Sequence, residues 1–186
     1  MRPYAVILLA LVLLLEGCAS TERRRAARLA NPAPCPNVFV LEQAARFIDF
    51  RGAEPALENV AFSGEIDDVT SSCRYYADVP IDAEVAFTMS IGRGPAAEED
   101  TVMVEYFVAV TRTNRDVIAK ETFQVPVTFK PGQSVVTLTE EIESIVIPRA
   151  KEATSGLNFE IAIGFVLTEE QFRWNRSGAS LKFPEL

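Results

Sequence analysis

The sequence predicts an all-β protein: an antiparallel β-sandwich of about seven strands, immunoglobulin-like, with a short C-terminal helix. Two observations predict this fold class. Several segments alternate apolar and polar residues with a period of two, as strands of a half-solvated sheet do. Turn-forming residues separate these segments at short intervals. A small β-barrel is the alternative architecture.

Three segments carry the alternation most clearly. Between Val79 and Ile91 the odd positions are apolar and most even positions are polar or charged. The same pattern recurs in 117–129 and in 157–167. Residues 101–112 are largely apolar on both faces, which predicts a central strand covered on both sides.

Irregular positions refine this assignment. Within 59–76 the apolar parity changes near Asp67 and Asp68, which predicts a β-bulge. Pro126 cannot donate a ladder hydrogen bond, so its strand is expected to be an edge strand or to bulge there. Residues 38–50 fit both helical spacing and a strand, and we favour a strand.

Turn and helix signals delimit the elements. Residues 114–116 link two strands closely, and 92–95 open a longer loop that reaches about Asp100. In 130–133 Pro and Gly hold the central positions of a type II turn. Thr168 and Gln171 match a capping box, which predicts a short helix from about Glu169 to Asn175.

The N-terminal region has the pattern of an export signal. The apolar run from Tyr4 to Leu15 is too short to span a bilayer and has the length of a signal-peptide core. Residues 15–18, Leu-Glu-Gly-Cys, resemble a lipobox, from which Glu16 departs. We therefore expect a lipoprotein signal peptide over 1–17 and a lipid on Cys18. An ordinary signal peptide or a short membrane anchor is the alternative.

Residues 18–37 are expected to form the lipid anchor and a Pro/Arg-rich tether, and 38–186 the sandwich domain. Arginines 23, 24, 25 and 28 would lie against anionic head groups. Three prolines in 31–36 favour an extended spacer. Five of the 18 Lys and Arg and two of the 26 Asp and Glu precede Leu29, which leaves 13 cations against 24 acids. An acidic body of this kind argues against a nucleic acid partner.

The remaining cysteines, Cys35 and Cys73, form an even pair in an oxidising compartment. We favour a disulfide between them, and two free buried thiols are the alternative. No CxxC motif is present, which argues against a thioredoxin-like redox role.

The sequence offers little chemistry for catalysis. It contains no histidine, so Ser-His-Asp and Cys-His triads and His-ligated zinc sites are excluded. Two acidic groups, Glu98-Glu99-Asp100 and Asp67-Asp68, could in principle supply paired carboxylates or calcium ligands. Neither has the spacing of a known motif, and we favour a solvated acidic loop. No catalytic residue, metal or cofactor is predicted.

The C-terminal segment is the best candidate for recognition. It places Phe172, Arg173, Trp174 and Arg176 within five residues, and interfaces are enriched in these residue types. The alternative is that Phe172 and Trp174 close one end of the sandwich.

Five stretches of the chain carry a resemblance to known sequences: 93–95, 105–111, 147–148, 163–171 and 175–176. On these residues, and over nearly the whole mature chain, the sequence resembles a group of uncharacterised alphaproteobacterial-type envelope lipoproteins. The resemblance implies the location and the anchor. It implies no activity and no catalytic residue.

Three functions follow as hypotheses. The first is a non-enzymatic envelope lipoprotein that serves as accessory, scaffold or adaptor for a protein partner. The second is a carrier or sensor of small molecules or lipids with a pocket between the sheets. The third is a carboxylate-based cell-wall hydrolase. Ala19 after the lipid cysteine favours the outer membrane, facing the periplasm, and the inner membrane is the alternative.

Overall fold

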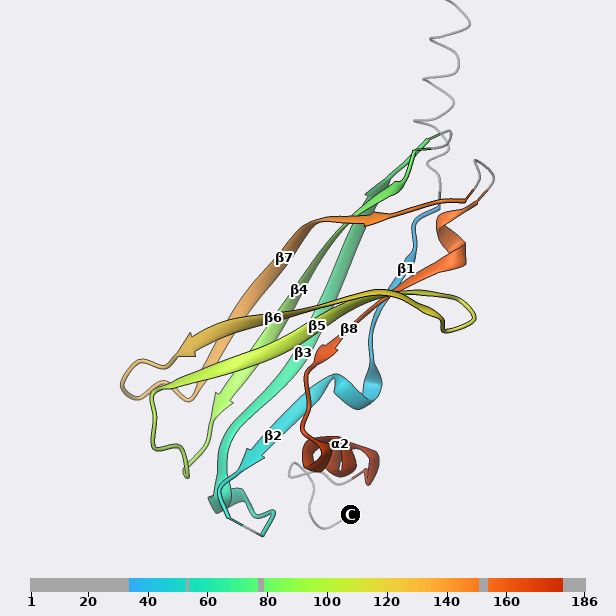
Figure 1. Ribbon diagram of the computed structural model, residues 1–186. Helices are drawn as coiled ribbons and strands as arrows, with labels where there is room; N and C mark the ends of the chain where they lie inside the picture. Colours follow the sequence, from blue (N-terminus) through green and yellow to red (C-terminus); the bar gives the residue numbers. More distant parts are fainter. Residues whose placement is uncertain (1–33, 53, 77–78, 151–153, 179–186) are drawn as a thin grey trace, which may run out of the picture. The chain divides into compact units, whose positions relative to one another are not determined.

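The computed structural model describes residues 34–52, 54–76, 79–150 and 154–178, which form two four-stranded sheets (Figure 1). Sheet A contains, in spatial order, β1 (Asn37–Val40), β8 (Phe159–Phe165), β5 (Thr101–Arg112) and β6 (Val117–Thr128). Sheet B contains β2 (Arg46–Phe50), β3 (Val60–Arg74), β4 (Ile81–Arg93) and β7 (Val135–Ile147). Short helices complete the fold: η1 (Glu42–Ala44), η2 (Leu57–Asn59), η3 (Gly156–Asn158) and α2 (Glu169–Arg176). The predicted antiparallel sandwich with a C-terminal helix is confirmed.

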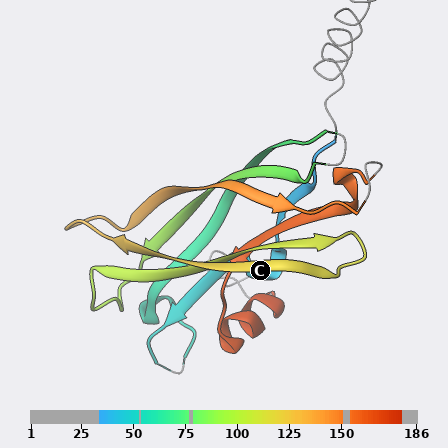
Figure 2. The same cartoon turned by 45° about the horizontal axis from the view of Figure 1, so that its top comes forward.

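The connections between the sheets follow the immunoglobulin pattern at the centre. The chain crosses from β4 to β5 and from β7 to β8, while β4 pairs with β7 and β5 with β8. Strands B, C, E and F of immunoglobulin domains are related in this way. The outer strands differ, because β1 pairs in parallel with β8 and β3 forms a hairpin with β4. Figure 2 shows the two layers from a second direction.

The described residues form eight strands instead of about seven, because 38–50 does not form one strand. The chain leaves sheet A after β1, turns through η1 and enters sheet B as β2. This accounts for the mixed signal in the sequence, since strand and helical spacing both occur within thirteen residues. Ala44 of η1 is 6% exposed and packs over Gly164, whose missing Cβ would lie 2.7 Å from the Ala44 Cβ.

The core lies between the sheets and is built from the alternating positions. The inward side chains of β4, from Ile81 to Ile91, are at most 2% exposed, and Ile161 and Ile163 of β8 are fully buried. Burying one such side chain stabilises the fold by roughly 1.5–3 kcal/mol. Phe87 of sheet B meets the Tyr106 ring of sheet A edge to face, with 5.1 Å between ring centroids. The core therefore joins the two sheets through direct aromatic contact.

Two of the expected faces are only partly covered. In β6 the side chains from Val117 to Thr122 are all exposed, and burial of the apolar face begins at Phe123. The β5–β6 hairpin projects beyond the sandwich, so no opposing sheet covers its apolar residues (Figures 1 and 2). Likewise β5 is covered on both faces near Ala109, which is 6% exposed, but Met103 on the outer face is 55% exposed.

The predicted irregularities are confirmed. The β3–β4 register shifts between Ile66 and Val69, which places the bulge at the two aspartates. Pro126 lies in β6, an edge strand of sheet A. The N–H of Gln133 donates to the Lys130 carbonyl oxygen at 2.9 Å, and Gly132 has a φ of +79°. Both hydrogen bonds of the capping box at the start of α2 are formed.

The expected signal peptide over 1–17, Cys18 and nearly all of the tether lie outside the described residues. Within the described segments, no helix is both long and apolar enough to cross a membrane.

Candidate functional site

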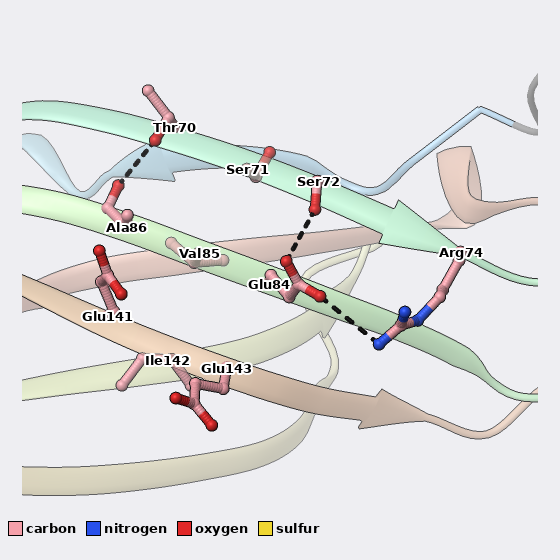
Figure 3. Close-up of a pocket in the computed structure, with 10 residues that line it drawn as sticks. All are labelled: Thr70, Ser71, Ser72, Arg74, Glu84, Val85, Ala86, Glu141, Ile142 and Glu143. Atoms are coloured by element: carbon pink, nitrogen blue, oxygen red, sulfur yellow. Dashed lines mark hydrogen bonds and ion pairs between the residues drawn. The ribbon is translucent and has the colours of Figure 1, made fainter.

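A shallow open groove of about 580 Å³ lies over β3, β4 and β7 of sheet B (Figure 3). Its lining is mainly polar and comes from three neighbouring strands: Thr70, Ser71, Ser72, Arg74, Glu84, Val85, Ala86, Glu141, Ile142 and Glu143. Most of these positions are exposed because they belong to the outward phase of the alternation. A bulge in the β4–β7 pairing has its extra residue on β7, so Glu143 and Ser144 are both exposed opposite Glu84.

Three charged groups at this groove, Arg74, Asp82 and Glu84, are engaged with one another. The Arg74 guanidinium lies 3.6 Å from Glu84 Oε1 and 3.3 Å from Asp82 Oδ2, and the Ser72 hydroxyl donates to Glu84. The hydrogen bond from the Ser144 hydroxyl lowers the pKa of Asp82, and Arg74 lowers this pKa further. A carboxyl with a lowered pKa stays ionised and is a poor proton donor at neutral pH. The groove therefore presents hydrogen-bonding groups to solvent in a geometry suited to surface contact.

The acidic pair at the β3 bulge is also engaged. The Ser90 hydroxyl donates to Asp67 Oδ2 at 2.7 Å, and the Asp68 backbone N–H donates to Thr88 Oγ1 at 3.3 Å. These contacts hold the bulge against β4. They give the Asp67 carboxylate a structural use that the sequence alone does not reveal, whereas Asp68 contributes through its backbone.

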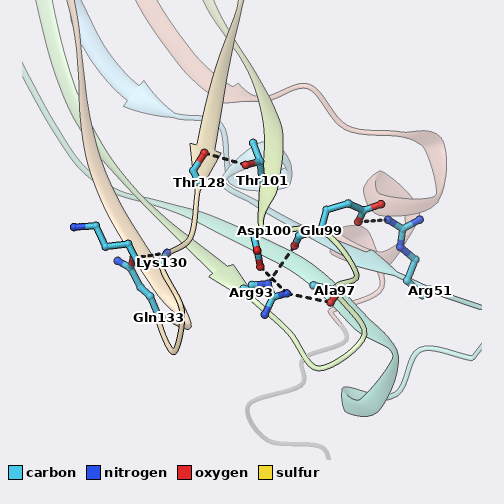
Figure 4. Close-up of polar contacts among 9 residues, drawn as sticks. All are labelled: Arg51, Arg93, Ala97, Glu99, Asp100, Thr101, Thr128, Lys130 and Gln133. Carbon is cyan, nitrogen blue, oxygen red and sulfur yellow. Dashed lines mark hydrogen bonds and ion pairs between the residues drawn. The ribbon is translucent and has the colours of Figure 1, made fainter.

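The predicted acidic loop is balanced by arginines from other segments (Figure 4). Arg51 pairs with Glu99 at 3.2 Å, and Arg93 pairs with Asp100 at 3.1 Å. The Arg93 guanidinium also donates to the Glu99 and Ala97 carbonyl oxygens. Among the residues that the structure describes, no three Cys, Asp or Glu side chains lie close enough to hold a metal ion. The loop is thus an ion-paired surface turn.

A polar contact that the sequence analysis missed crosses the core. The Tyr106 hydroxyl from sheet A donates to Glu140 Oε2 of β7, in sheet B, at 2.8 Å. Tyr106 is 2% exposed, and its ring also stacks on Phe123. Burial raises the pKa of Tyr106, and the Glu140 carboxylate raises it further. No local signal marks this pair, because the two residues are 34 positions apart on different sheets.

The four predicted recognition residues lie on α2 in two different environments. Trp174 packs edge to face on Phe50 of β2 at 5.2 Å, so it fastens the helix to sheet B. Phe172 is 40% exposed, and the Arg176 guanidinium lies 5.7 Å from the centre of its ring. Arg173 is exposed and lies 3.8 Å from Glu169.

A residue that the sequence analysis passed over completes the docking of α2. The Asn175 amide donates to the backbone carbonyl oxygens of Gln43 at 2.9 Å and Arg46 at 2.7 Å. These two bonds tie the helix to the segment between β1 and β2. The helix is therefore a fixed platform, with Phe172, Arg173 and Arg176 on its exposed side.

The predicted disulfide between Cys35 and Cys73 is present, with the two Cα atoms 5.7 Å apart. It connects the start of the described chain, two residues before β1, to the second-to-last residue of β3. The bond joins the two sheets at one end of the sandwich.

Comparisons with known proteins give no functional assignment. No family model matches the chain, and no curated protein matches it significantly. Among solved structures, the variable (V) domain of the AgI/II polypeptide BspA from Streptococcus agalactiae is 11% identical, with a TM-score of 0.19. The match covers 65% of this chain and 73% of that domain. A likeness of this size does not bear on function.

Proposed function

We propose that this chain is a non-enzymatic envelope lipoprotein, anchored by a lipid on Cys18, whose sandwich serves as an accessory, scaffold or adaptor module for another envelope protein. The observation that carries the proposal is the pairing of the cysteines. Cys35 and Cys73 bond to each other, as expected for an exported protein. The third cysteine, Cys18, stands directly after Leu-Glu-Gly at the end of the apolar N-terminal run.

The arrangement of the body favours surface recognition over carriage of a small molecule. Carriage needs an apolar pocket of about 300 Å³ or more. The space between the sheets is filled by a cluster of buried side chains that includes Phe87, Tyr106 and Phe165, each at most 2% exposed. The groove over sheet B is open and polar, which suits contact with another macromolecule better than enclosure of an apolar ligand.

The carboxylates also favour binding over hydrolysis. A glycosidase needs two acids facing each other across a cleft, one of which holds a proton. Asp82 has a lowered pKa, Glu84 is paired with Arg74, and Glu99 and Asp100 are paired with arginines. Such pairing directs these carboxylates at their cationic partners and not at each other across a cleft.

We place the partner contact on the exposed side of α2. Phe172 supplies an apolar surface, and Arg173 and Arg176 supply donors on either side. The capping box and the Asn175 bonds hold these groups rigidly, which lowers the entropy lost on binding. Location at the outer membrane, facing the periplasm, remains part of the proposal because Ala19 follows Cys18.

Two experiments test the proposal separately. Metabolic labelling with a radioactive fatty acid should mark the wild type and leave Cys18→Ser unlabelled. Equal labelling of both proteins would refute the anchor.

Crosslinking in whole envelopes, followed by purification, should recover one stoichiometric protein partner. The Phe172→Ala/Arg176→Ala variant should lose it, while Leu57→Ala, at a 65% exposed position elsewhere, should keep it. Repeated recovery of no partner from wild type would refute the adaptor role.

A further inference from the structure

The chain enters the body at one identifiable end, which we call the tether-root end. It comprises Cys35 with its disulfide partner, the β5–β6 hairpin, and the described residues of the β3–β4 and β7–β8 connections. The pairings Asn37 with Glu160, Arg112 with Phe159 and Ile81 with Ile147 bring these segments to the same end of the two sheets. The disulfide fixes the entry point there.

This end also carries exposed apolar side chains. Six of the twelve large hydrophobic side chains exposed in the described residues lie here: Tyr76, Val79, Val117, Ile118, Val146 and Leu157. Tyr76 is 58%, Leu157 63% and Val117 64% exposed. Exposed apolar patches mark contacts with proteins or membranes. Tyrosine is typical of membrane interfaces, because its ring is apolar and its hydroxyl is polar.

The same end displays two arginines that neutralise no acid in the described residues. Arg112 and Arg115 are exposed, and neither forms an ion pair there. The nearby Asp116 carboxylate accepts instead from the Asn114 amide at 2.8 Å. At the opposite end, by contrast, Arg51 and Arg93 are paired with carboxylates. In a body with 13 cations and 24 acids, this hairpin is a local concentration of available positive charge.

The hairpin that carries these arginines is held rigidly. The Arg112 N–H donates to the Asp116 carbonyl oxygen at 2.9 Å, and the Arg115 N–H donates to the Arg112 carbonyl oxygen at 2.8 Å. The Thr113 N–H donates to the Asn158 carbonyl oxygen at 3.2 Å, which ties the hairpin to η3. The arginines and Leu157 of η3 are therefore presented together.

A hollow of about 430 Å³ opens between the hairpin and the β7–β8 connection. Arg112, Thr113 and Asn114 line it from the hairpin, and Pro148, Thr154 and Asn158 from the connection. Its guanidinium, hydroxyl and amide groups suit the oxygens of a phosphate head group.

We propose that the tether-root end rests on an anionic bilayer surface, with Arg112 and Arg115 binding lipid phosphates and Tyr76 and Leu157 entering the head-group layer. This inference rests on the proposed lipid anchor and adds an orientation to it. The lipid anchor supplies the bilayer, and the charge of the hairpin selects anionic lipid. α2 stays available to a protein partner, because it packs on η1 and β2 outside the tether-root end.

Hydrogen exchange on the lipidated full-length chain tests this orientation. The protein is inserted into vesicles of phosphatidylcholine alone, or into vesicles with about one-third phosphatidylglycerol. Peptides that cover 112–118 and 156–159 should exchange several-fold more slowly in the anionic vesicles, and high salt should abolish the difference. A peptide over 94–100, at the opposite end, should exchange at the same rate in both.

Two matched double variants distinguish an effect of charge on the hairpin from an effect of the net charge of the protein. Arg112→Gln/Arg115→Gln should lose the protection, since each cation near the surface favours the docked state about five-fold. Arg51→Gln/Lys130→Gln removes two cations at the opposite end and should keep it. Circular dichroism of both variants checks that the fold is intact.

The outcomes distinguish this inference from the proposed function. A chain that fails to stay with vesicles of either composition contradicts the lipid anchor. A chain that stays with the vesicles but exchanges equally in both contradicts the orientation alone. Slower exchange of 94–100 in the anionic vesicles, with no change in the hairpin, would also contradict the proposed orientation.

Discussion

Replacing Tyr106 by Phe removes a polar contact from the middle of the core and leaves its shape intact. The ring keeps its stack on Phe123 and its edge contact with Phe87, so no cavity forms. The Glu140 carboxylate loses a hydroxyl donor at 2.8 Å. A bond to a charged acceptor contributes roughly 1.5–3 kcal/mol. Glu140 is half-buried and water can replace part of the bond, so we expect a loss of about 1.5 kcal/mol.

The pH dependence of the free energy of unfolding gives a second, independent test of the contribution of Tyr106. An unfolded tyrosine titrates near its ordinary pKa of 10.0, and burial raises the pKa of Tyr106 in the folded protein. The contribution is therefore complete below pH 10.0 and is lost as the pH rises toward the folded pKa. Over that window the unfolded state holds fewer protons, so stability falls by about 1.4 kcal/mol per pH unit. The Tyr106→Phe variant has no hydroxyl to titrate, so its free energy of unfolding lacks this fall with pH.

Urea unfolding of wild type and variant, at neutral pH and above pH 10.0, measures both quantities. The stability difference should be largest at neutral pH and shrink in alkali. A double-mutant cycle with Glu140→Ala, which removes the acceptor, should give a coupling energy of about 0.5–1.5 kcal/mol. Equal midpoints for wild type and Tyr106→Phe at both pH values would refute the reasoning.

Three further predictions concern stability. Cys35→Ser/Cys73→Ser should cost about 4 kcal/mol in the chain-entropy model for a separation of 38 residues, measured by urea unfolding; a midpoint that does not move would contradict it. Thr168→Ala removes the cap of α2 and should cost about 1 kcal/mol, seen as a lower melting temperature; no change would mean that the helix is held by its packing alone. Gly94→Ala would place a Cβ 2.1 Å from the Val60 carbonyl oxygen and should cost at least 2–3 kcal/mol by the same assay; a wild-type melting temperature would show that the backbone relaxes there.

The sequence predicted the structure best where the whole signal lies within a single strand or helix. β4 alternates without a break over thirteen residues, and its inward positions are the buried ones. The bulge in β3 was predictable for the same reason, since an extra residue shifts the parity of every later side chain. The capping box at Thr168 was also readable, because both of its hydrogen bonds lie within four residues.

The sequence was least informative where a feature depends on distant segments. An apolar face is buried only if another layer covers it, and nothing within 117–122 indicates that the hairpin projects from the sandwich. The parallel pairing of β1 with β8 joins residues more than 120 positions apart. The Tyr106–Glu140 bond and the ion pair between Arg51 and Glu99 likewise join separate elements. The four residues predicted for recognition lie together on α2, but the division between a half-buried Trp174 that supports the helix and an exposed side required the structure.

The cysteine bond at the chain entry has a mechanical consequence. β1 has only four residues and holds to β8 through a short ladder, so a pull on the N-terminal segment would otherwise detach it first. Cys35 precedes β1 and is bonded to Cys73 of β3, an interior strand of sheet B with fifteen residues. Tension along the tether is therefore transmitted through a covalent link to the long ladders of sheet B. The disulfide therefore keeps β1 in place under a force that would break the four-residue ladder between β1 and β8.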